Sequence, residues 1–123
     1  MQSINELTKT IIGCAYEVGN TLGSGFLERV YENALAIELR AHGLQIAQQV
    51  PFKIKYKDAI VGDYFADLIV ENRVIVEIKS VRALDKAHIA QCINYLTAAE
   101  LNLALLFNFD KSRVEVRRIA RNL

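Results

Sequence analysis

The sequence predicts an α/β sandwich, in which a mixed central sheet lies between flanking helices. Apolar residues recur at helical spacing in three stretches, over about residues 4–22, 26–42 and 84–100. Segments rich in β-branched residues separate these stretches and follow the last one. The resulting order is helix, helix, three or four antiparallel strands, helix, strand, strand. The third helix is then a right-handed crossover that places the strand at 103–109 parallel to the strand that ends near Lys79.

Length and composition fit one compact globular domain. The chain has 123 residues, of which 52% are hydrophobic and 24% charged. A net charge of +1 excludes a strongly basic tail, so any nucleic-acid contact must be a local patch. Cys14 and Cys92 lack metal-ligand spacing and lie in helix-like stretches, which predicts two reduced thiols without a disulfide. With no signal-like or membrane-spanning stretch, we expect a cytoplasmic protein without membrane contact.

The first two helices follow from their caps and apolar stripes. Ser3, with Glu6 three residues later, is typical of a helix start, and the stripe from Ile4 to Leu22 is regular. A turn at 23–25 separates this helix from the second, which we expect to begin near Phe26 and to end at 42–43. Its predicted buried stripe contains Leu27, Val30, Ala34 and Leu35. Glu28 and Glu32 lie one turn apart on the same side, where acidic residues are usually solvated.

The rest of the chain predicts strands around the third helix. Residues 44–50, 52–56 and 60–65 partly alternate between apolar and polar, and Pro51 indicates an edge or a kink. The nearly continuous apolar run at 103–109 is typical of a strand covered on both faces, and residues 114–119 predict a final, more exposed strand. In the third helix, His88, Gln91 and Tyr95 fall on one face and could be either surface polar residues or part of a site.

A hairpin at residues 66–79 carries the residues with the clearest chemistry. If residues 71–73 form a three-residue loop, Val70 opposes Val74, and Asp67 opposes Glu77 on the face that Lys79 shares. A slip of one residue would mix charges into the apolar face, so the hydrophobic pattern favours this register. The other face then collects only apolar side chains: Leu68, Val70, Val74, Val76 and Ile78.

Two carboxylates and an ammonium group at one end of a hairpin suit a metal site. Carboxylate oxygens are ligands for magnesium, which keeps several waters for substrate oxygens. Lys79 would lie beside the metal, where it could stabilise developing charge or orient a water. The same three residues also fit a plain alternative, in which Glu77 and Lys79 form a surface ion pair and Asp67 meets water at a strand end. These residues alone leave both interpretations open.

One segment resembles a known family. The sequence Gly25-Phe26-Leu27-Glu28-Arg29-Val30-Tyr31 matches the signature of the small bacterial and archaeal GxxExxY proteins, a branch of the PD-(D/E)XK nuclease-like superfamily. The resemblance covers nearly the whole chain, because residues 62–67, 77–79, 88–91 and 94–96 resemble the later blocks of the family in order and spacing. One departure is Val18-Gly19-Asn20, where many members have a histidine after the valine.

The resemblance implies a restriction-endonuclease-like domain over residues 1–123 and a role for each matching residue. Asp67, Glu77 and the Ile78 carbonyl would hold Mg2+, or Mn2+, and Lys79 would be the catalytic lysine. Three further residues are implied as catalytic or supporting groups: Glu28 from the second helix, and Gln91 and Tyr95, which match a Gln-x-x-x-Tyr pattern of related nucleases. The implied activity is hydrolysis of phosphodiester bonds in nucleic acid, and of the two possible substrates we expect DNA rather than RNA.

Two other functional classes remain open from the sequence. The chain could be a non-catalytic nucleic-acid- or protein-binding module that retains the fold. It could also depend on a homodimer or a partner protein to complete its groove, because so small a domain has little surface for substrate recognition. Among the basic residues, Arg82 and Lys86 flank the candidate site and are the ones we expect at phosphates. The remaining lysines and arginines are expected to be ordinary solvated residues.

Overall fold

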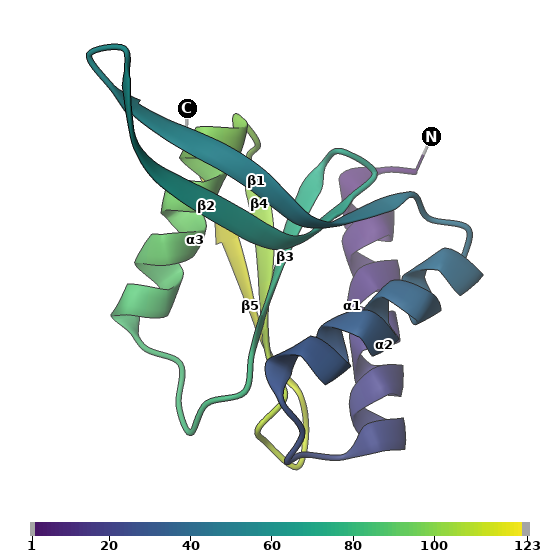
Figure 1. The fold of residues 1–123 in the computed structure, drawn as a ribbon. Coiled ribbons are helices and arrows are strands. Elements are labelled where there is room, and N and C mark those ends of the chain that lie inside the picture. Colours follow the sequence, from purple (N-terminus) through teal and green to yellow (C-terminus); the bar gives the residue numbers. More distant parts are fainter. Residues whose placement is uncertain (1, 122–123) are drawn as a thin grey trace.

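The protein is a five-stranded mixed sheet covered by three helices, seen here in a computed structural model that describes residues 2–121 (Figure 1). The sheet has the strand order β1-β2-β3-β4-β5, with β3 and β4 parallel and every other pair antiparallel. This confirms the predicted α/β sandwich and the crossover through the third helix. The elements are α1 (Ile4–Leu22), α2 (Glu28–Ala41), β1 (Ile46–Tyr56), β2 (Ala59–Val70), β3 (Val74–Lys79), α3 (Lys86–Ala99), β4 (Leu103–Asn108) and β5 (Glu115–Ala120).

The two faces of the sheet bury two separate apolar layers. Helices α1 and α2 pack on one face, and α3 packs on the other (Figure 1). Because neighbouring strand residues point to opposite faces, Leu68 and Val76 join the α1–α2 layer, whereas Ile69 and Ile75 join the α3 layer. Strand β4 is buried along its whole length, as its continuous apolar sequence predicts. Within residues 2–121, the helices are too short or too polar to cross a membrane.

The predicted register of the central hairpin is confirmed. Val70 pairs with Val74, Ile69 with Ile75 and Leu68 with Val76 around the turn at 71–73. The Arg73 N–H donates to the Val70 carbonyl at 3.0 Å and closes this turn. All five apolar residues that the sequence assigned to one face lie in the α1–α2 layer.

Helix α1 matches its prediction, but the buried face of α2 does not. Ser3 caps α1, since its hydroxyl accepts the Glu6 N–H at 3.1 Å. Helix α2 begins at Glu28, and its N-cap, Leu27, is 80% exposed. Val30 is also exposed, so the predicted stripe was wrong at both positions. The buried residues of α2 are Tyr31, Glu32, Leu35, Ala36 and Leu39.

The aromatic ring of Tyr31 explains this rotation of α2. Tyr31 is fully buried and stacks on Phe109, with the ring centroids 4.5 Å apart. Its hydroxyl donates to the Gly23 carbonyl at 2.5 Å and accepts the Phe26 N–H at 3.2 Å. Because the ring occupies the core, Leu27 and Val30 turn outward, and Glu32 turns toward the sheet.

Strands β1 and β2 form a long arm that projects beyond the rest of the sheet (Figure 1). Strand β1 runs through Pro51 without a break and is an edge strand, which is one of the two places predicted for that proline. The arm turns at Lys57 and Asp58, both of which have positive φ. Its outer part exposes Tyr56, Ile60 and Val61.

Candidate functional site

Asp67 and Glu77 bind each other's strand by reciprocal hydrogen bonds. The Asp67 N–H donates to Glu77 Oε2 at 2.7 Å, and the Ile78 N–H donates to Asp67 Oδ2 at 2.9 Å. Both bonds lie just beyond the last regular pair of the hairpin, Leu68 with Val76. The strands separate here, so the two carboxylates accept backbone N–H groups of the opposite strand. Both side chains are thereby held in a defined orientation at the open end of the hairpin.

A third carboxylate, Glu32 of α2, joins this pair through glutamines of β1. Glu32 is only 3% exposed. Gln49 Nε2 donates to Glu32 Oε1 at 2.7 Å and to Asp67 Oδ1 at 3.2 Å, so one amide bridges two acids. Gln48 Nε2 donates to Glu32 Oε2 at 2.8 Å. We call Glu32, Asp67 and Glu77, with Lys79, the carboxylate site.

The backbone of Gln49 is strained where it serves this site. Its φ is +52°, in the left-handed region that residues other than glycine rarely adopt within a strand. Such a conformation costs on the order of 1–3 kcal/mol and persists only where the surroundings impose it. The two bonds from the Gln49 amide to Glu32 and Asp67 are the interactions that this conformation makes possible. Sequence reasoning missed both Gln49 and Glu32.

Burial and charge repulsion raise the pKa values of two acids of this site, Asp67 and Glu77. Glu77 is 2% exposed, and burial, together with the nearby Asp67 charge, raises its pKa to about 8. Burial likewise raises the pKa of Asp67, against the lowering effect of the Ile78 N–H, and Glu32 raises it further. Lys79 lowers the pKa of both acids but does not offset these effects. A cation among the three carboxylates would relieve the repulsion.

Lys79 and Tyr95 lie close to the two acids. Lys79 is half-buried at the end of β3 and makes no ion pair within 4.0 Å with any residue from 2 to 121. Tyr95 of α3 is buried, and burial and the charges of Glu77 and Asp67 raise its pKa to about 12. Its ring meets Tyr64 edge-on, with the centroids 5.0 Å apart. Gln91 is half-buried one turn before Tyr95.

Glu28 lies at the edge of the site and binds a backbone group. Its Oε2 accepts the Ser80 N–H at 3.0 Å, one residue beyond Lys79, and its side chain is exposed. The Ser80 hydroxyl also approaches the Phe26 carbonyl at 3.4 Å. The turn before α2, which the Tyr31 hydroxyl holds through Gly23 and Phe26, therefore contacts the segment just after β3. In this arrangement Glu32, one turn further along α2, is the α2 carboxylate that shares an amide with Asp67.

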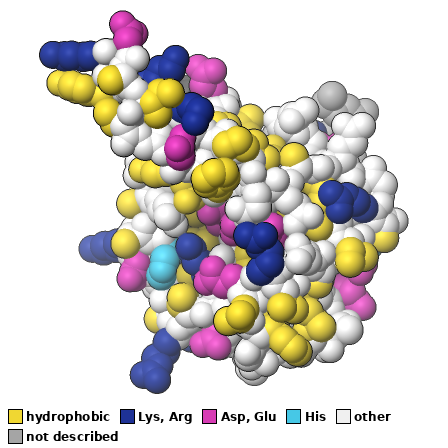
Figure 2. Space-filling model, viewed as in Figure 1, with side chains coloured by type: hydrophobic (Ala, Val, Ile, Leu, Met, Phe, Trp, Pro, Cys, Tyr) yellow, Lys and Arg dark blue, Asp and Glu magenta, His cyan; other side chains and the backbone are white. Residues whose placement is uncertain are grey.

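The segment after β3 carries the two predicted phosphate contacts. Arg82 and Lys86 are exposed there. Asn108 holds the segment, because its side chain accepts the Val81 N–H at 3.1 Å and donates to the Val81 carbonyl at 2.8 Å. His88 completes the capping box of α3 with Asp85, which gives it a structural role. Figure 2 shows acidic and basic side chains gathered in the middle of this face, between α2 and α3.

The donor set of the carboxylate site fits a hard divalent cation. Asp67, Glu77 and Glu32 supply carboxylate oxygens, which suit Mg2+ or Mn2+ and not a thiophilic metal. Ile78 is held in the site by its N–H bond to Asp67, and metal ligation by its carbonyl stays a prediction. Metal ligation by Asp67 and Glu77 likewise stays a prediction.

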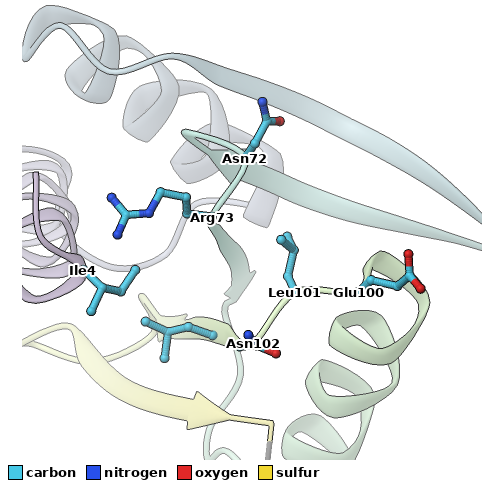
Figure 3. A pocket seen from close by; sticks show the side chains of 7 residues that line it. Ile4, Asn72, Arg73, Glu100, Leu101 and Asn102 are labelled. Atoms are coloured by element: carbon cyan, nitrogen blue, oxygen red, sulfur yellow. The ribbon is translucent and has the colours of Figure 1, made fainter. Parts of the chain in front are cut away.

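A pocket of about 300 Å3 lies at the other end of β3 and β4 (Figure 3). It is lined by Ile4, Asn72, Arg73, Glu100, Leu101, Asn102 and Leu103. None of the predicted site residues lines it. The carboxylate site lies apart from this pocket, at the open end of the β2–β3 hairpin.

Comparison with known protein families identifies the superfamily to which the chain belongs. Residues 5–119 match the PD-(D/E)XK nuclease superfamily, and the chain belongs to that superfamily. The protein therefore has a nuclease-type fold, whose members are usually nucleases that use divalent metals. The match is compatible with the GxxExxY resemblance but does not test it. No curated protein and no solved structure gave a significant match.

Proposed function

We propose that the protein is a metal-dependent nuclease of the GxxExxY type that hydrolyses phosphodiester bonds, with DNA preferred over RNA. The observation that carries this proposal is the convergence of three carboxylates at the open end of the β2–β3 hairpin, beside Lys79, which forms no ion pair with any residue from 2 to 121. The acids come from α2, β2 and β3, and each accepts at least one hydrogen bond from a side-chain or backbone amide N–H group. The fold belongs to a nuclease superfamily, so an accumulation of buried acids has a functional explanation.

Each residue of the site would have a distinct role in the reaction. Asp67 and Glu77, with Glu32 and the Ile78 carbonyl, would bind Mg2+ or Mn2+. When bound, the ion would polarise the scissile phosphate and lower the pKa of a coordinated water. The Lys79 ammonium group would orient that water or stabilise negative charge that develops on the phosphate. Glu28, through the Ser80 N–H, would keep the segment after Lys79 in place.

Tyr95 and Gln91 would support the substrate side of this site. The Tyr95 hydroxyl stays protonated at neutral pH, since its pKa is about 12, so it can donate a hydrogen bond to a phosphate oxygen. Arg82 and Lys86 would contact phosphates further along the strand. Removal of either cation would weaken binding for every sequence to a similar degree, because phosphates carry no sequence information.

A cleavage assay tests this proposal. Purified protein is incubated with labelled single- and double-stranded DNA and RNA, with Mg2+ or Mn2+ and with EDTA as the metal-free control. Lys79→Ala is compared with Lys9→Ala, which removes an exposed lysine from α1. We expect metal-dependent cleavage by the wild type and by Lys9→Ala, and none by Lys79→Ala.

Two results would contradict the proposal in different ways. If wild type and Lys79→Ala behave alike on every substrate while both bind metal, the protein is not a nuclease of this kind. A non-catalytic nucleic-acid- or protein-binding role would then be the better account. If cleavage depends on Lys79 but occurs only on RNA, the nuclease activity stands, and the preference for DNA is wrong.

A further inference from the structure

A second group of potential metal ligands lies between α1 and the carboxyl-terminal end of α2. Cys14 belongs to the buried face of α1, Glu38 to the last turn of α2, and His42 is the C-cap residue of α2. Cys14 Sγ lies 3.5 Å from His42 Nδ1, and His42 Nδ1 lies 3.7 Å from Glu38 Oε2. One donor atom from each residue lies within 4.8 Å of the other two.

We propose that Cys14, Glu38 and His42 form a zinc site that links α1 to the carboxyl-terminal end of α2. Two of the three donor–donor separations are close to those of tetrahedral coordination. With Zn–S near 2.3 Å and Zn–N near 2.05 Å, a tetrahedral angle places sulfur and nitrogen about 3.6 Å apart, and nitrogen and a carboxylate oxygen about 3.4 Å apart. The sulfur–nitrogen distance of 3.5 Å agrees with the first value, and the nitrogen–oxygen distance of 3.7 Å requires a shift of a few tenths of an ångström in a side chain at the surface.

The mixture of sulfur, nitrogen and oxygen donors selects the metal. Thiolate and imidazole ligands favour zinc, whereas magnesium prefers oxygen donors alone. The negative end of the α2 dipole also favours a cation at this position. Three protein ligands leave a fourth position for water, as in open zinc sites. The zinc site would therefore be chemically distinct from the carboxylate site, even though α2 contributes to both.

The exposure of His42 and Glu38 allows a metal to enter. Cys14 is buried at 2% exposure, but the His42 and Glu38 side chains are 49% and 31% exposed, and His42 Nδ1 lies 3.5 Å from the thiol sulfur. On binding, the Cys14 S–H bond breaks, an S–Zn bond forms and the proton passes to solvent. His42 would carry its proton on Nε2, so that the Nδ1 lone pair is free for the metal.

A simpler arrangement of the same residues contains no metal, and the experiment must separate the two. His42 Nδ1 lies 3.0 Å from the Glu38 carbonyl, so a proton on Nδ1 could make a hydrogen bond that closes the end of α2. In that case Cys14 is an ordinary buried thiol, whose pKa burial raises to about 11. Only the zinc site creates a metal–thiolate bond, and that bond has its own absorption band.

Titration of the full chain with Co2+, a spectroscopic substitute for zinc, tests the proposal. The protein is reduced, freed of metal with a chelator and kept in excess Mg2+ to occupy the oxygen-ligand site. Cys14→Ala and His42→Ala are compared with Cys92→Ala, which removes the other buried free thiol. We expect one Co2+ per wild-type chain, with a near-ultraviolet thiolate-to-cobalt band that Zn2+ abolishes. The band should persist in Cys92→Ala and disappear in both other variants.

The affinity for zinc and the stabilisation of the protein by zinc should both depend on His42. Competition with a chromophoric chelator should show zinc affinity at least about tenfold weaker in His42→Ala, and zinc should raise the Tm of the wild type but not of this variant. His42 is exposed, so this variant is expected to fold even if Cys14→Ala does not. The proposal is wrong if the wild type gives no thiolate band, or if the band survives in His42→Ala.

Discussion

Helix α2 has a group of ionisable side chains at each end, and the two groups are built in opposite ways. Near the amino-terminal end, Glu32 is buried and receives hydrogen bonds from two glutamine amides of β1. At the other end, Glu38 and His42 are one turn apart and partly exposed, and only Cys14 is buried. The first group depends on contacts between elements far apart in the sequence. The second depends mainly on helical spacing.

The comparison shows that one helix can contribute to two sets of potential metal ligands that differ in their donor atoms. Buried oxygen donors repel one another, and that repulsion raises the pKa of Glu77 and Asp67. They suit a hard cation that neutralises them. The group at the other end has a single carboxylate, Glu38, beside a thiol and an imidazole, so it lacks a cluster of buried acids. The predictions below separate the two ends, from the largest expected effect to the smallest.

Glu77→Gln should have the largest effect, because it should strongly impair the function of the carboxylate site and leave the zinc site unchanged. The amide oxygen can still accept the Asp67 N–H, but the charge that binds the metal is lost. We expect nuclease activity to fall roughly a thousandfold, which corresponds to about 4 kcal/mol of transition-state stabilisation. Single-turnover cleavage measures this loss. The cobalt band of the zinc site should stay unchanged, and a variant within tenfold of wild-type activity would contradict the role given to Glu77.

The affinity of the carboxylate site for Mg2+ should rise with pH. Glu77 has its ordinary pKa of 4.5 in the unfolded chain and a pKa of about 8 in the folded protein, so folding takes up a proton between these values. The metal-free protein should therefore lose stability as the pH rises through this window. Because Mg2+ displaces the proton, its affinity should rise up to about tenfold per pH unit and level off above about pH 8.

Calorimetric titrations in buffers of different ionisation enthalpy measure both the affinity and the released proton. Glu77→Gln is the control, since it lacks the Glu77 carboxyl group, and its weaker affinity should change less with pH than that of the wild type. A wild-type affinity that does not change between about pH 6 and 8 would show that Glu77 is already ionised in the folded protein.

Gln49→Ala should have an intermediate effect and act only at the amino-terminal end of α2. The substitution removes the amide that bridges Glu32 and Asp67. Loss of such a supporting bond typically costs ten- to a hundredfold in metal affinity or activity. Gln48→Ala is the matched control, because Gln48 binds Glu32 and Asn33 but not Asp67, and it should have a smaller effect. Equal losses in both variants would mean that the bridge to Asp67 has no special role.

Tyr31→Phe should have the smallest effect, on stability. The ring and its stacking on Phe109 remain, but the Gly23 carbonyl and the Phe26 N–H lose their partner. We expect the free energy of unfolding to fall by about 1–3 kcal/mol, measured by urea denaturation. Tyr16→Phe serves as the control, because that half-buried ring faces Arg113 and should keep this contact. An unchanged stability would show that the hydroxyl does not hold the turn before α2.

The sequence predicted the central hairpin well because one physical rule decides it. Alternation of side chains in a strand permits only one register that separates Leu68, Val70 and Val76 from the charged residues. The same register places Asp67 and Glu77 together, and their reciprocal hydrogen bonds follow from it. The order of the helices and strands was equally accessible, since each has its own apolar period.

Glu32 and Gln49 could not be found in the same way. The helical stripe through Leu27 and Val30 put Glu32 on the solvent side, whereas the buried ring of Tyr31 turns it inward. A stripe drawn through Tyr31, Leu35 and Leu39 was the signal that could have found Glu32. Gln49 depends on a backbone conformation that no local pattern indicates. Both residues show that the contacts between elements, and not the elements themselves, were hard to predict.

The proline in the middle of β1 has a consequence for how molecules of this protein meet. Strand β1 is eleven residues long and lies at the edge of the sheet, so its outer side presents unpaired backbone groups to solvent. Pro51 has no N–H to donate, and it interrupts the row of donors that a neighbouring chain would need in order to add a strand. The arm can therefore expose apolar side chains at its tip while its edge resists stacking into fibrils.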